Sequence, residues 1–248
     1  MDDDTDPYEP GAERDPPPRR RGAGWNWLMV LALLVVTVVL IGLTSPLVLR
    51  SSKASERTQA INNARQVGIA LVEFDREFGS FPDNGTMEAV AESIGYDHGS
   101  SGNHSNDYFR QLVAFGVQSE EIFFAKTAYT HEPDGIIRGS RALAPGEVGF
   151  GYVMLDATTG QNTSGNPGRP VLATPLLDAR TDWSFDPGPH HGRAVVLRLD
   201  GSASVLPIRD HDQRVSVGKG RTMGENGDET VWGTGVNPVI KAPDKGPR

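Results

Sequence analysis

The chain of 248 residues contains no cysteine. This excludes disulfide frameworks, thiol nucleophiles, Cys-ligated zinc and iron–sulfur clusters, and it leaves only oxygen and imidazole donors for any metal. Basic residues are also few, because 24 Lys and Arg stand against 32 Asp and Glu and give a net charge of −8. Nucleic acid bound through bulk charge is therefore excluded as a partner.

Recognisable catalytic motifs are missing as well. The sequence has no GxSxG elbow, no phosphate-binding loop and no dinucleotide fingerprint. The carboxylate pairs Glu73–Glu77 and Glu120–Glu121 carry no sign of the cleft that acid/base catalysis needs. The prediction is a protein that is not an enzyme, with no identified small-molecule substrate.

One long apolar block is present and is the strongest signal in the sequence. No charged residue occurs from Gly22 to Leu49, and residues 25–49 as a helix are long enough to cross a hydrocarbon layer of about 30 Å. A cleaved secretory signal has a shorter apolar core, of about 7 to 15 residues, and ends in a small-residue cleavage site. A retained transmembrane helix is therefore predicted, with the lipid bilayer as a partner.

The residues before this block differ sharply from it. Residues 1–24 hold seven acids, four arginines and five prolines, a composition that cannot bury enough apolar surface to order the segment. We expect a disordered N-terminal arm or leader. Arg19, Arg20 and Arg21 adjoin the span directly, and the bias of basic residues toward the cytoplasmic side places this arm in the cytoplasm. The prediction is a bacterial inner-membrane protein whose C-terminal domain is periplasmic or extracytoplasmic.

Residues 50–79 contain no proline and carry one apolar stripe at alternating four- and three-residue steps, which predicts an amphipathic stalk helix. Gly79 and Pro82 supply the stop signal. Nothing in the sequence breaks the backbone between the apolar block and the stalk, so one helix from about 25 to 79 is expected. The stripe must be covered by the protein's own core or by a neighbouring subunit, and its members are Ala60, Ala64, Val67, Leu71, Phe74 and Phe78.

The remainder is rich in glycine and proline and predicts short elements. Residues 80–208 are expected to form an α+β head domain with two short helices near 86–94 and 107–115, followed by β-rich runs at 148–155, 170–177, 193–199 and 202–208. The last two runs flank Asp200-Gly201, which predicts a hairpin. Residues 209–248 are polar and predict a loosely ordered C-terminal tail. The expected fold is a long N-terminal helix packed on a small antiparallel sheet.

Three segments carry a resemblance to a known family. RRRGAG ends at Gly24 and is followed by Trp25 and, further on, Pro46. NNARQVGIALVEFDREFGSFPD (62–83) ends the long helix, and HHGRAVVLRLDGSASVLPI (190–208) forms the closing hairpin. Together these features resemble the type IV pilins and type II secretion pseudopilins, over about half of the chain.

The resemblance implies a structural role without catalysis. It implies leader processing between Gly24 and Trp25, assembly with other pilin-like subunits, and a place in a type II secretion or type IV pilus-like apparatus. Met29 stands where the family has a glutamate that registers neighbouring subunits. This departure implies a minor or divergent component or, alternatively, a membrane-anchored extracytoplasmic binding or sensor module that does not polymerise.

The sequence predicts no cofactor. The resemblance adds one alternative, a calcium ion in the acidic C-terminal loops, as in some pseudopilins. The residues there that could hold a divalent ion match no known ligand spacing and favour a turn-rich loop; they are His190, His191, Asp182, Asp186 and Asp200.

Overall fold

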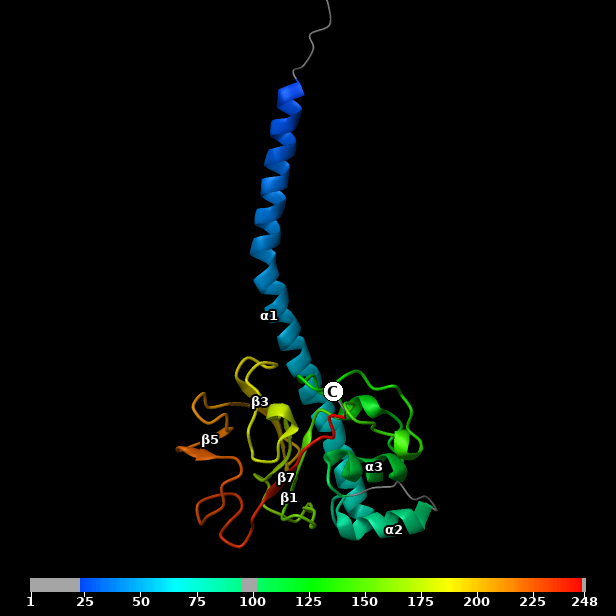
Figure 1. Cartoon of the computed structure of the whole chain (residues 1–248). Coiled ribbons are helices and arrows are strands. Elements are labelled where there is room, and N and C mark those ends of the chain that lie inside the picture. The colour runs from blue at the N-terminus through cyan, green and yellow to red at the C-terminus, as the bar shows by residue number, and fades with distance from the viewer. Residues whose placement is uncertain (1–22, 95–101, 247–248) are drawn as a thin grey trace, which may run out of the picture. The chain divides into compact units, whose positions relative to one another are not determined.

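A computed structural model describes residues 23–94 and 102–246 (Figure 1). By its internal contacts the chain divides into two units, Met1–Val48 and Leu49–Arg248. The predicted N-terminal arm lies outside the described residues apart from its last two positions. The folded part of the second unit combines helices with an antiparallel sheet, which confirms the α+β class.

The first unit holds the N-terminal part of helix α1 (Ala23–Phe78), whose bounds agree with the expected helix from about 25 to 79. Every side chain from Trp27 to Val39 is exposed, and the large apolar ones are between 45% and 68% exposed. Over the described residues, no helix offers a stretch that is both long and apolar enough to span a bilayer.

In the second unit, α1 supplies the centre of the main hydrophobic core. Ala60, Val67 and Phe74 are fully buried, and Phe78 is half-buried at the edge of the same core. The predicted stripe therefore packs inside the protein. Phe78 ends the helix, and Gly79 follows in the left-handed region with φ +79°, a conformation that glycine adopts without a steric penalty.

Two short helices follow α1, as predicted. Helix α2 (Asn84–Ile94) is capped by Asp83, whose Oδ1 accepts a hydrogen bond from the Thr86 backbone N–H while the Thr86 hydroxyl accepts one from the Asp83 N–H. This reciprocal pairing is a capping box. Helix α3 is Ser105–Phe115, and the 3-10 helices are η1 (Glu120–Phe123), η2 (Gly139–Arg141) and η3 (Leu177–Ala179).

Five antiparallel strands form the main sheet in the order β4-β3-β2-β1-β7. The predicted hairpin is present as β3–β4, with Asp200-Gly201 between the strands. A two-stranded sheet pairs β5 with β6. The strands are β1 (Gly151–Met154), β2 (Pro170–Thr174), β3 (Arg193–Arg198), β4 (Ala203–Pro207), β5 (Ser216–Gly218), β6 (Arg221–Thr222) and β7 (Val239–Lys241).

Both faces of the main sheet are buried, because successive side chains of a strand point to opposite sides. Val195 and Leu197 face the core that contains α1, whereas Ala194 and Val196 face a second core that contains Trp232. The segment expected to be a loosely ordered tail contributes Val215, Met223, Trp232, Ile240 and Ala242 to the second core. Residues 209–246 instead contain three strands, and β7 pairs with β1. Their apolar members are scattered among polar residues, so the local sequence pattern does not indicate strands there.

Candidate metal centre

The predicted C-terminal ligands do not come together as a metal group in the structure. Asp182, Asp186 and Asp200 each accept a hydrogen bond from a backbone N–H two residues onward, which stabilises a local turn. His190 is buried while His191 is exposed. Among the described residues, the one group of three or more acidic or imidazole side chains close enough to share an ion is Glu120, Asp134 and Glu147. These three residues are called the acidic cluster below.

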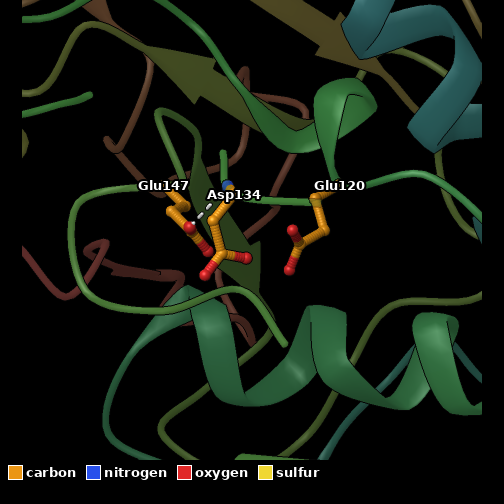
Figure 2. Close-up of side chains that lie close together, drawn as sticks. All are labelled: Glu120, Asp134 and Glu147. Carbon is orange, nitrogen blue, oxygen red and sulfur yellow. Dashed lines mark hydrogen bonds between the residues drawn. The ribbon is translucent and has the colours of Figure 1, made fainter. Parts of the chain in front are cut away.

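The acidic cluster belongs to the connection between α3 and β1, residues 116–150. This connection contains only the two short helices η1 and η2. Irregular connections of this length are uncommon in folded domains unless they have a function of their own. Figure 2 shows the three carboxyl groups converging from separate parts of the connection.

Glu120 is buried, and one of its carboxylate oxygens has no hydrogen-bond partner among the described residues. It lies at the start of η1, where the Ser119 hydroxyl caps the helix by accepting a hydrogen bond from the Glu121 N–H. The Glu120 side chain is 2% exposed. Its Oε1 accepts a hydrogen bond from the Leu143 N–H at 2.7 Å, but its Oε2 has no hydrogen-bond partner within the described part of the chain.

Glu147 is equally buried, at 1% exposed, and holds two turns of the connection together. Its Oε1 accepts a hydrogen bond from the Asp134 N–H at 2.9 Å, and its Oε2 accepts one from the Ala144 N–H at 2.6 Å. Glu147 is therefore fixed in position by the backbone that surrounds it.

Asp134 forms the solvent side of the cluster. Its Oδ1 accepts a hydrogen bond from the Ile136 N–H at 2.8 Å, and its Oδ2 pairs with the exposed guanidinium of Arg141 at 2.9 Å. The side chain of Asp134 is exposed, so the cluster has a buried side at Glu120 and Glu147 and an open side at Asp134.

The electrostatics of the cluster oppose full ionisation. Burial raises the pKa of Glu120, and the negative charges of Glu147 and Asp134 raise it further, while the backbone N–H groups of Leu143 and Gly135 oppose this shift. The pKa of His131 is raised chiefly by the Glu132 carbonyl, with the Pro145 carbonyl and the charges of Glu147 and Asp134 acting in the same direction. Glu147 and Asp134 thus make a smaller contribution that favours positive charge at His131.

Chemically, three carboxylates with one unused buried oxygen can hold a metal ion. One oxygen from each residue lies within 4.8 Å of the others. The donors are all oxygen, which suits hard cations and not zinc or copper. The sequence does not predict this cluster, because its three members are far apart in the chain and match no ligand spacing.

Comparison of the chain with protein-family models, with curated proteins and with solved structures gave no match. The functional interpretation therefore depends on the fold and on the geometry of its side chains.

Proposed function

We propose that this protein is a non-catalytic, single-pass membrane subunit of the pilin-like type. It would be a minor or divergent component of a type II secretion or type IV pilus-like apparatus. In this proposal residues 25–49 cross the bacterial inner membrane with the N-terminus in the cytoplasm, and the α+β unit lies on the extracytoplasmic side.

The observation that carries the proposal is the change in character along α1. Its side chains from Trp27 to Val39 are apolar and exposed, apart from the small polar Thr37, whereas Ala60 to Phe74 bury an apolar stripe in the core of the second unit. An exposed apolar surface of this kind needs lipid or neighbouring helices to cover it. The uncharged sequence from Gly22 to Leu49 supports lipid as the cover.

A specific observation also favours the second candidate function, a membrane-anchored binding or sensor module that does not polymerise. Met29 stands at the position of the registering glutamate of pilins, and it is exposed on α1. Small and polar residues that help membrane helices associate are also sparse around it.

Processing of the N-terminus separates these two functions. The full chain would be produced in a bacterial host together with a prepilin peptidase, and washed membranes would be analysed by intact-protein mass spectrometry. We expect the chain in the membrane fraction, beginning at Trp25. Gly24→Leu should block the cleavage, whereas the matched variant Gly22→Leu should be processed like the natural sequence.

The remaining outcomes are equally informative. A membrane-bound chain that keeps residues 1–24 in the presence of the peptidase would support the fixed anchor. A full chain that stays in solution without detergent would contradict both functions.

A further inference from the structure

We propose that the acidic cluster of Glu120, Asp134 and Glu147 binds a calcium ion, which fastens residues 116–150 to the rest of the second unit. The site precedes the sheet, and it shares no residue with the C-terminal loops in which the family resemblance places calcium. It does not depend on the proposed membrane function, because all three ligands belong to the second unit.

The first argument is the unused oxygen of Glu120. A buried carboxylate oxygen normally has a partner, since burial without one costs a large part of the group's solvation free energy. Oε2 of Glu120 has none among the described residues, and the carboxyl group faces Asp134 and Glu147 (Figure 2). A cation between the three residues would supply that partner and would offset the repulsion among three negative charges.

The second argument is the size of the cluster. Calcium accepts oxygen ligands at about 2.3–2.6 Å in flexible geometry, whereas magnesium requires near-ideal octahedral geometry at about 2.1 Å. The three oxygens lie within 4.8 Å of one another, so small side-chain movements would bring all three into the coordination shell of one calcium ion.

The third argument is the arrangement of protein and solvent around the site. Calcium takes about 6 to 8 oxygen ligands in flexible geometry, and water commonly supplies some of them. Asp134 is exposed, which leaves an open side for water. The exposed guanidinium of Arg141 pairs with Asp134 Oδ2, and its exposure lets it move aside when the ion binds.

The role follows from what the cluster residues hold. Glu120 and Glu147 accept hydrogen bonds from the adjoining Leu143 and Ala144 N–H groups. The carbonyl of Leu143 in turn accepts a hydrogen bond from Asn106 Nδ2 on α3. On the other side, Asn63 Nδ2 on α1 donates to the carbonyls of Glu121 and Phe124 at 2.7 and 2.9 Å. An ion at the cluster would therefore hold residues 116–150 in place against α1 and α3.

Calcium binding can be measured on the full chain in a mild detergent after removal of metals with a chelator. Isothermal titration with CaCl2 at pH 7 should show one ion bound per chain. Thermal unfolding in 5 mM CaCl2 should give a Tm higher by roughly 5 °C than in chelator, as expected for a ligand that binds the folded state in the 0.1 mM range. The same concentration of MgCl2 should give a much smaller shift.

Two variants and one control make the result specific. Glu120→Gln keeps the shape of the side chain and should abolish the calcium-dependent rise in Tm, and Asp134→Asn should weaken calcium binding at least tenfold. Glu121→Gln is the matched control, because Glu121 is the exposed neighbour of Glu120, and it should respond to calcium like the natural chain.

Three results would overturn the proposal. They are the absence of binding heat and of a Tm shift in the natural chain, an equal response in Glu120→Gln, and an equal response to magnesium. In the first two cases the cluster would be stabilised by a proton on Glu120, and Glu120→Gln would then leave the Tm in chelator unchanged or higher. None of these results would alter the N-terminal processing expected for the proposed membrane subunit.

Discussion

At the scale of single residues, His190 is a buried ionisable group of the second unit. Its side chain is fully buried, and within the described part of the chain neither ring nitrogen has a hydrogen-bond partner. Burial lowers the pKa of His190 to about 4, and the nearby positive charge of Arg57 adds to this shift. The folded state therefore holds the ring neutral across most of the acidic range.

This environment predicts a loss of stability in acid. Below pH 6.5 the unfolded chain takes up a proton on His190 while the folded chain does not, so the free energy of unfolding falls by about 1.4 kcal/mol per pH unit. The loss continues until the pH reaches the folded pKa of about 4 and amounts to roughly 3 kcal/mol. His190→Leu should remove this contribution, which urea unfolding at pH 7 and pH 4.5 would measure.

The control for this prediction is the adjacent exposed residue. His191 has a positive φ of 54°, a conformation that asparagine tolerates well, so His191→Asn keeps the backbone and should show the same acid loss as the natural chain. If His190→Leu lost as much stability between pH 7 and 4.5 as the natural chain, the buried ring would not be the cause.

At the scale of elements, the C-terminal part of α1 packs its apolar stripe into the core of the second unit. Phe74 is fully buried, and its ring centroid lies 4.5 Å from that of Phe78 and 5.6 Å from that of Phe115 on α3. Aromatic pairs at these separations contribute beyond their buried area. The end of α1 is thus held to α3 as well as to the sheet.

Removing this contact should be costly. Phe74→Ala deletes a fully buried ring and leaves a cavity, so we expect the free energy of unfolding to fall by about 3–5 kcal/mol. Ile69→Ala is the matched control on the same helix, because Ile69 is 62% exposed, and it should change stability by less than about 0.5 kcal/mol. Chemical unfolding of both variants would test this, and equal losses would mean that the stripe is not the core face.

The elements that the sequence predicted well are those with a strong local pattern. The stripe from Ala60 to Phe78 repeats at helical spacing, and Asp200-Gly201 between two apolar runs is a local hairpin signal. The acidic cluster has no such pattern, because Glu120, Asp134 and Glu147 meet only after the connection has folded. Val239 and Ile240 are apolar enough to cover a sheet edge, but the sequence does not indicate the pairing of β7 with β1, which lies far away in the chain.

At the scale of the whole molecule, both faces of the main sheet are buried, and segments from opposite ends of the chain contribute to the two cores. Helix α1 contributes to the core on one face, and residues after Pro207 contribute to the core on the other, where Trp232 is 2% exposed. The Trp232 indole N–H donates a hydrogen bond to the Met223 carbonyl at 2.9 Å, and the Arg169 guanidinium lies 5.5 Å from the ring centroid. The C-terminal segment is therefore part of the fold.

A chain that ends after Ile208 tests this conclusion. The truncation removes β7 from the edge of the sheet and exposes Val196 and its neighbours on the second face. We therefore expect the cooperative thermal transition to be lost, together with the near-ultraviolet circular dichroism signal of a packed interior. Trp232→Ala is the milder comparison. It keeps β7 and should lower the free energy of unfolding by about 3–5 kcal/mol while leaving one cooperative transition. A sheet with one uncovered apolar face cannot keep the stability of a sheet that is covered on both faces. If the truncated chain melted at the Tm of the full chain, residues 209–248 would therefore be a loose tail, and the folded head would end near residue 208.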